Sequence, residues 1–307
     1  MYVVETHDLT KVYSGKAVVD HTNMHIPEGS IYGFVGENGS GKTTIMRLIT
    51  GIASPSAGSF DLFGVKNNDI GIMKARKNIA AIVETVSLVP SMSAYSNIVY
   101  QELYQGMKLT KDERKKLLEL VHLDQTGKKK AGNFSLGMRQ RLGIACALIG
   151  KPKFLLLDEP MNGLDPQGIA DLRDLILELN QKEGITILIS SHILSELEKV
   201  ATVFGFISHG KIIEELSVQE LQDKCRKSLE MKFADPTLVE PVLKALGVKE
   251  FKAYPNGDVK IFDEIDDLGA FISKINDKKA KLLSINSSDE NVEDYYFDLI
   301  KGGKTNA

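Results

Sequence analysis

Hydrophobic residues follow two different periods along this chain. Continuous apolar runs predict buried strands at 30–35, 79–83, 154–158, 185–190 and 203–207. Segments 2–9 and 18–26 alternate apolar and polar residues, as half-buried antiparallel strands do, with a turn at Ser14-Gly15 between them. Helical spacing is found near 45–50 and within 88–130, 137–148 and 167–181. Strands that alternate with helices predict an α/β fold with a largely parallel sheet.

The composition changes after about residue 224, where a second series of elements begins. We expect strands at 229–234, 249–254, 258–263 and 280–285, and helices at 237–246, 266–276 and 291–301. The first six of these elements have the order β-α-β-β-α-β, which is the ferredoxin-like order. We therefore assign 1–222 to a first domain and 223–307 to a small α+β accessory domain.

Length and composition narrow the class of protein. A chain of 307 residues with 43% hydrophobic and 26% charged residues is typical of a soluble protein with two domains. The net charge of −3 offers no strong field for a nucleic-acid partner, so we expect none. Cys146 and Cys225 lie far apart and indicate neither a disulfide framework nor a zinc site. We find no signal-peptide pattern and no apolar run long enough to span a bilayer.

A glycine-rich segment separates the strand at 30–35 from the helix that follows it. Glycines let several backbone N–H groups point inward, and the helix adds the positive end of its dipole, so the segment forms a nest for polyphosphate. In this Walker A pattern, Lys42 would reach the β- and γ-phosphates and Thr43 would coordinate Mg²⁺. The alternative is a chance glycine turn. The predicted phosphate loop comprises Gly36, Glu37, Asn38, Gly39, Ser40, Gly41, Lys42, Thr43 and Thr44.

Two acids stand at the end of the apolar run 154–158, which is the Walker B pattern. Asp158 would hold Mg²⁺, and Glu159 would act as the general base on the attacking water. The alternative is a strand that merely ends in acids. His192 follows the strand at 185–190 and could reach the γ-phosphate, although a lone histidine is often structural.

Four further residues are candidates on local grounds. Glu84 directly follows the strand at 79–83, where it could approach the nucleotide or its metal, or could be a solvated acid. Tyr13 precedes a turn upstream of the phosphate loop and could stack on adenine or pack in the core. Ser135 and Gly137 stand at a helix N-terminus, which is a second anion-binding geometry.

The order of these features resembles that of the ATP-binding subunit of an ABC transporter, over about residues 1–220. The resemblance implies a P-loop NTPase domain with an antiparallel β subdomain and a helical subdomain. It maps Tyr13 onto the adenine-stacking aromatic residue and His192 onto the switch histidine. It also implies that Phe134–Met138 is the signature segment, whose Ser135 and Gly137 meet the γ-phosphate, and that Asn162–Asp165 is the D-loop.

Two departures from the usual pattern point to one branch of that family. The signature is Phe-Ser-Leu-Gly-Met instead of Leu-Ser-Gly-Gly-Gln, and Glu84 replaces the usual glutamine, because no glutamine precedes Gln101. This substitution looks like the bacitracin-resistance and lantibiotic-immunity branch, whose members clear peptide antibiotics from the membrane. A carboxylate keeps an oxygen for Mg²⁺ or water but loses the amide donor.

The resemblance also implies how the chain assembles. We expect ATP and Mg²⁺ as ligands, and a head-to-tail dimer, because one chain holds one phosphate loop and one signature. Integral-membrane permease subunits would supply the spans and contact the surface near Glu84 and 85–105, with the chain peripheral on the cytoplasmic face of the membrane. The alternatives are an ABC ATPase outside transport, associated with nucleic acid or ribosomes, and a non-hydrolysing nucleotide-binding regulator.

Overall fold

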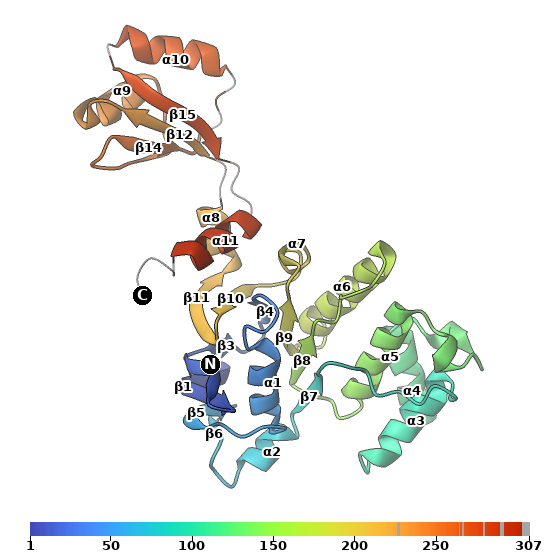
Figure 1. Ribbon diagram of the computed structural model, residues 1–307. Helices are drawn as coiled ribbons and strands as arrows, with labels where there is room; N and C mark the ends of the chain where they lie inside the picture. Colours follow the sequence, from blue (N-terminus) through green and yellow to red (C-terminus); the bar gives the residue numbers. More distant parts are fainter. Residues whose placement is uncertain (226–227, 264, 266, 279, 289–291, 303–307) are drawn as a thin grey trace. The chain divides into compact units, whose positions relative to one another are not determined.

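The chain forms two compact units, Met1–Val218 and Gln219–Ala307. The computed structural model describes residues 1–225, 228–263, 265, 267–278, 280–288 and 292–302 (Figure 1). The division falls four residues before the predicted boundary at 222/223. It lies at the start of α8 (Val218–Lys224). Lys224, the last residue of this helix, donates a hydrogen bond from Nζ to the Tyr295 hydroxyl at 2.9 Å, and both residues belong to the second unit.

An antiparallel sheet forms one layer of the first unit, as the resemblance implied. Its strand order is β2-β1-β5-β6, with β3 paired to β1. The predicted strand at 18–26 is wrong as a single element, because it is interrupted between β2 and β3. Asn23 lies in the interruption and exchanges side-chain hydrogen bonds with the backbone and carboxylate of Asp8. The strands are β1 (Tyr2–Tyr13), β2 (Lys16–Thr22), β3 (His25–Pro27), β5 (Ala57–Leu62) and β6 (Val65–Lys66).

A six-stranded sheet forms the centre of the unit, and five of its strands match the five predicted apolar runs, whereas β11 matches none of them. The order is β11-β10-β4-β9-β8-β7, and every neighbouring pair is parallel except β10 with β11. The order brings the carboxyl ends of β4, β9 and β8 side by side, and ligands of α/β proteins bind at that edge. The strands are β4 (Ile31–Val35), β7 (Ile79–Ile82), β8 (Phe154–Asp158), β9 (Thr186–Ser191), β10 (Val203–Ser208) and β11 (Lys211–Ser217).

The helical part of the unit is built from α3, α4 and α5. Thr110 and Glu113 form the capping box at the start of α4. Arg114 of α4 binds Glu102 of α3 through two hydrogen bonds of 2.7 and 2.9 Å, and these bonds hold the pKa of the Glu102 carboxyl below its usual range. The helices of the unit are α1 (Lys42–Thr50), α2 (Ile72–Arg76), α3 (Ala94–Tyr104), α4 (Lys111–Leu120), α5 (Leu136–Leu148), α6 (Pro166–Gln181) and α7 (Leu194–Leu197), with 3₁₀ turns at Asp124–Thr126 and Ala131–Asn133.

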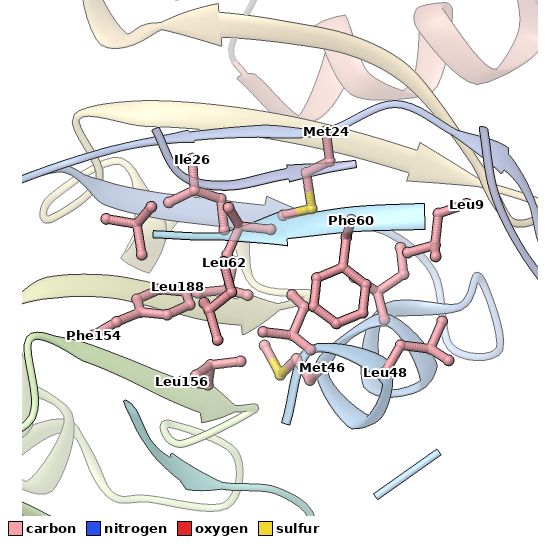
Figure 2. Packing of buried hydrophobic residues seen from close by; sticks show 14 of the residues in the cluster. Leu9, Met24, Ile26, Met46, Leu48, Phe60, Leu62, Phe154, Leu156 and Leu188 are labelled. Carbon is pink, nitrogen blue, oxygen red and sulfur yellow. The ribbon is translucent and has the colours of Figure 1, made fainter. Parts of the chain in front are cut away.

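The main hydrophobic core lies where α1 packs between the two sheets. Phe60 of β5 is fully buried against Met46 of α1, and Leu156 and Leu188 close the layer from the parallel sheet (Figure 2). Each large apolar side chain buried in this way contributes about 1.5–3 kcal/mol. The core therefore fixes α1, and with it the loop that precedes the helix.

The second unit is a four-stranded antiparallel sheet with helices. The strand order β13-β14-β12-β15 places β14 between β12 and β13, which is the split β-α-β arrangement of ferredoxin-like domains. No helix in the described part of either unit is long and apolar enough to cross a membrane. The elements that follow α8 are β12 (Ser228–Phe233), a 3₁₀ turn (Pro236–Leu238), α9 (Val239–Ala245), β13 (Phe251–Ala253), β14 (Asp258–Ile261), α10 (Leu268–Asp277), β15 (Leu282–Ser288) and α11 (Val292–Gly302).

Candidate functional site

The loop between β4 and α1 has a backbone that only glycine fits at two positions. A Cβ on Gly36 would lie 2.6 Å from the Ile207 carbonyl oxygen and from Ser40 Oγ. Gly41 has φ +113°, and a Cβ there would lie 2.8 Å from the Val18 carbonyl oxygen. Gly41 is also the N-cap of α1, and no side chain caps that helix. The N-terminal N–H groups of α1 are therefore available to an anion.

Two segments that are distant in sequence support the phosphate loop, one directly and one through the first. Gly210, in the turn between β10 and β11, donates from its N–H to the Ser40 carbonyl at 2.9 Å. The Gly210 carbonyl in turn accepts hydrogen bonds from the Asp20 N–H at 2.9 Å and from the Thr22 hydroxyl at 2.7 Å, both on β2. The loop geometry therefore depends on β2 and on the closing hairpin as well as on its own glycines.

The Lys42 ammonium lies inside this loop. Its side chain is only 5% exposed, and Nζ donates to the carbonyl oxygens of Gly36 at 2.6 Å and Glu37 at 3.2 Å. Nζ also lies 3.5 Å from Glu159 Oε1. A buried cation held mainly by neutral carbonyls is well placed to bind an anionic ligand that enters the loop.

Thr43, Asp158 and Ser190 form a hydrogen-bonded group across three elements. The Thr43 hydroxyl donates to Asp158 Oδ2 at 2.8 Å, and the buried Ser190 hydroxyl donates to Asp158 Oδ1 at 2.6 Å. Ser190 Oγ also accepts from the Glu159 N–H at 2.9 Å. Thr43 and Asp158 thus present two hard oxygen donors beside each other, which is the donor type that Mg²⁺ prefers.

Glu159 and His192 form a pair at the ends of β8 and β9. His192 Nδ1 lies 2.8 Å from Glu159 Oε2, and because an ionised carboxylate can only accept, Nδ1 carries the proton. The other carboxylate oxygen, Oε1, is buried and has no hydrogen-bond partner among the described residues. Glu159 has φ +48°, an uncommon value for a residue with a side chain. Its backbone therefore turns sharply at the strand end and directs the carboxylate toward the loop.

Glu84 lies beyond the end of β7 and pairs with α1. Its carboxylate forms an ion pair with Arg47, and its side chain is 58% exposed. In the described part of the chain, no hydrogen bond or ion pair joins Glu84 to Asp158 or Glu159. The structure thus places Glu84 at the edge of the site, bound to the helix that follows the phosphate loop.

Tyr13 ends β1 at the hairpin that leads into β2. The residue is 43% exposed, and the Lys11 ammonium lies 4.9 Å from the ring centroid. A half-exposed aromatic face is what stacking on a base requires, whereas the core position considered as the alternative would be buried. Its proposed contact with adenine stays a prediction.

Ser135 and Gly137 lie on α5, apart from the phosphate loop. Ser135 is the N-cap of α5, and its hydroxyl accepts from the Met138 N–H at 3.2 Å. A Cβ on Gly137 would lie 3.6 Å from the Gly168 Cα of α6 and 3.8 Å from Leu164. Among the described residues, no hydrogen bond or ion pair connects Ser135 or Gly137 to the phosphate loop.

Beyond the backbone of the phosphate loop, the structure therefore gathers the side chains of five of the predicted site residues and adds one. The five are connected by contacts of 3.5 Å or less, whereas Tyr13, Glu84, Ser135 and Gly137 are outside this network. Ser190 was missed, and the only signal for it was a polar residue at the end of an apolar strand. The connected residues are Lys42, Thr43, Asp158, Glu159 and His192.

Comparison with known sequences gives close relatives over most of the chain. The profile of the family described as "ABC transporter" matches residues 19–162. The bacitracin transport ATP-binding protein BcrA of Enterococcus faecalis is 37% identical over 302 residues, which cover 98% of this chain and 97% of BcrA. The lantibiotic transport ATP-binding protein SrtF of Streptococcus pyogenes is 43% identical over 213 residues, which cover 69% of this chain and 90% of SrtF.

Comparison with solved structures supports the same fold. The ATP-binding cassette MJ0796, solved as a dimer in a post-hydrolysis state with ADP and Pi, matches with a TM-score of 0.62 and 24% identity. The match covers 70% of this chain and 98% of the cassette. The fold predicted for the first domain is thereby confirmed.

Proposed function

This chain belongs to the family of ABC transporter ATP-binding proteins, and from that premise we propose that it hydrolyses ATP to drive the removal of a peptide antibiotic from the membrane. The ATPase activity follows from membership of the family. The antibiotic, of bacitracin or lantibiotic type, is proposed because BcrA matches both units of the chain, including the accessory domain.

The contact between the Walker A and Walker B residues is the observation that carries the proposal. Thr43 and Asp158 are 115 positions apart in sequence, yet their side chains are hydrogen-bonded at 2.8 Å. The uncapped N-terminus of α1 and the Lys42 ammonium provide positive charge on the same side of the sheet. Triphosphate would bind in the loop, where Lys42 exchanges its carbonyl contacts for phosphate oxygens.

Glu159 is proposed as the general base. Its Oε1 accepts no hydrogen bond from the described residues and lies 3.5 Å from the Lys42 ammonium, whereas Oε2 is held by the His192 Nδ1–H at 2.8 Å. Oε1 would accept the proton of water once Lys42 binds phosphate. His192 thus orients the carboxylate, and a positioned general base contributes about 10²–10⁴ in rate. Thr43 and Asp158 would hold Mg²⁺, which would neutralise charge on the phosphates. Tyr13 would stack on adenine.

We further propose that two copies of the chain act together. Ser135 and Gly137 make no hydrogen bond or ion pair with the phosphate loop of their own chain in the described structure, and the N-terminus of α5 is an anion-binding geometry. A second copy in head-to-tail orientation would bring its signature to that loop. The cassette MJ0796 of the same fold was solved as a dimer.

Membrane subunits are the proposed partners, with the chain peripheral on the cytoplasmic face. The surface around Glu84 and residues 85–105 is the proposed contact, and its exposed side chains include Tyr100 and Tyr104. An ABC ATPase that acts on nucleic acid or ribosomes is not favoured, because the relatives reported above are transport proteins.

The test combines turnover with resistance. Purified chain should hydrolyse MgATP, and Glu159→Gln should reduce turnover about 100-fold or more while ATP binding is retained. Cells that express the chain with its membrane subunits should survive bacitracin or a lantibiotic, and cells with the Glu159→Gln variant should not. Equal turnover in both proteins would refute the role of the base, and equal sensitivity in both strains would refute the antibiotic.

A further inference from the structure

A polar pocket of about 370 Å³ lies beside the C-terminal end of α1, away from the predicted catalytic residues. It is bounded by the turn after α1, by β5 and by α2, which lie near one another at the lower edge of the first unit (Figure 1). Its polar side chains are all uncharged or basic, and no Asp or Glu lines it among the described residues. They are Ser54, Ser56, Ser59, Asn67, Asn68 and Arg76.

Arg76 supplies the positive charge of this pocket. Its Nε donates to the Ile49 carbonyl at 3.2 Å, which fixes the guanidinium beside Gly51. In the described part of the chain, Arg76 has no carboxylate partner, so its remaining N–H donors are available. Partial burial lowers the pKa of this guanidinium, as expected for a cation that no anion neutralises.

Two neighbouring side chains have free donor groups, because their oxygen atoms already accept hydrogen bonds from the backbone. Asn67 Oδ1 accepts from the Phe60 N–H at 3.1 Å, which leaves its NH₂ group free to donate. Ser56 Oγ accepts from the Val12 N–H at 3.0 Å, so its hydroxyl proton is also free. Lys11 adds a second cation nearby, because its Nζ donates to the Ser54 carbonyl at 2.7 Å. The pocket is thus built to accept an anion with several oxygens, such as a phosphate group.

Two large apolar side chains protrude next to residues that line the pocket, and a third, Ile70, lies two positions after the lining residue Asn68. Ile70 is 99% exposed, Ile52 69% and Met73 66%. Ile52 lies between the lining residues Gly51 and Ala53, and Met73 is one helical turn before Arg76, on the same side of α2. Apolar side chains in this number beside one polar pocket are unusual on a surface that faces only water.

The charge around these side chains favours a lipid surface over a protein partner. Segment 65–77 carries four basic residues, Lys66, Lys74, Arg76 and Lys77, and one acid, Asp69, so its net charge is +3, whereas the whole chain has −3. Lysine is depleted at protein interfaces but enriched where proteins contact anionic membranes. Protruding isoleucine and methionine side chains among lysines fit the boundary between head groups and acyl chains.

We propose that this corner of the first unit binds an anionic membrane phospholipid, with the head-group phosphate in the Arg76 pocket and Ile52, Ile70 and Met73 inserted beside it. The site needs no nucleotide and no second copy of the chain. It would hold the ATPase against the bilayer in addition to its contacts with membrane subunits. Because it involves none of the residues proposed for catalysis, it stands apart from the proposed function.

The test is binding of the purified full chain, without nucleotide, to vesicles of phosphatidylcholine with and without phosphatidylglycerol. Binding should require phosphatidylglycerol. Arg76→Gln should weaken it about fivefold, because one cation is lost at an anionic surface. Ile70→Ser combined with Met73→Ser should weaken it about tenfold or more, because two apolar side chains no longer insert. Both variants should keep their ATP turnover.

Matched controls are available elsewhere on the chain. Lys115→Gln removes one exposed cation, and Leu283→Ser removes one exposed apolar side chain, at positions 71% and 54% exposed. Both should bind vesicles like the unchanged protein. Vesicle binding that is equally weakened by the controls would overturn the proposal, as would its absence. If inorganic phosphate bound the chain with the same affinity as the vesicles do, free phosphate would be the ligand, and this result would also overturn the proposal.

Discussion

Ser190 connects both acids of the Walker B pair, and its removal should be felt in stability and in turnover. The hydroxyl is fully buried, donates to Asp158 Oδ1 at 2.6 Å and accepts from the Glu159 N–H at 2.9 Å. Ser190→Ala removes both hydrogen bonds and leaves the carboxylate oxygen and the N–H without that partner. A bond to a charged group contributes about 1.5–3 kcal/mol and a neutral one about 0.5–1.5 kcal/mol. The free energy of unfolding should therefore fall by about 2–4.5 kcal/mol.

The effect on turnover follows from the same geometry. The backbone of Glu159 has φ +48° and is anchored by this one side-chain acceptor, so its carboxylate should shift when the anchor is lost. A displacement of about 1 Å at a catalytic group can cost about 100-fold in rate. We expect turnover to fall by about one to two orders of magnitude, with a smaller change in ATP affinity.

Urea unfolding of the full chain, monitored by circular dichroism, measures the loss of stability, and steady-state ATP hydrolysis measures the loss of turnover. Because two units can unfold separately, the transition of the first unit is the one compared. Ser191→Ala is the matched control: among the described residues its hydroxyl accepts only from the Ile193 N–H, at 2.9 Å, so the variant should lose about 1 kcal/mol. The reasoning is refuted if Ser190→Ala costs no more than this control and leaves turnover unchanged.

Three further outcomes are expected. Glu84→Gln breaks the ion pair with Arg47 and should leave ATP affinity unchanged while altering peptide resistance in cells; unchanged resistance would contradict it. Arg114 lowers the pKa of Glu102 in the folded chain. The stability that this pair contributes should therefore be complete above the unfolded-state pKa of about 4.3 and be lost as the pH falls through the pKa of the folded state. The free energy of unfolding, measured as a function of acid pH, should show this dependence in the wild type and not in Glu102→Gln. Gly36→Ala should weaken ATP binding at least tenfold in a nucleotide-binding assay, because a Cβ there would collide with the loop and β10.

The parts of the site that could be predicted are those whose chemistry is written in consecutive residues. The glycine-rich loop before Lys42 and the two acids after β8 each combine a strand with a polar end. Because the carboxyl ends of parallel strands share one edge of a sheet, the approach of Asp158 to Thr43 follows without any structure. His192 could be placed at that edge for the same reason, at the end of β9.

The parts that could not be predicted depend on partners distant in sequence. Asn23 interrupts the strand expected at 18–26 because its side chain binds Asp8 on the neighbouring strand. The helix α2 is too short for periodicity to show, since it spans only Ile72–Arg76. Ser190 looks like any polar residue at a strand end until β8 lies beside it. For Asn23 and Ser190 the deciding contact joins a side chain to a residue of a separate element.

The hydrogen bonds that support the phosphate loop limit how small a functional fragment of this chain can be. All the residues that define the loop lie between 36 and 44, yet the Ser40 carbonyl is held by Gly210, which β2 anchors in turn. A fragment cut after α7 would retain every nucleotide-binding motif, His192 included, and still lose this support. A graft of these nine residues into another strand–helix scaffold would transfer the sequence of the motif without its conformation. The smallest part of the chain that could be moved with its function is therefore the whole first unit.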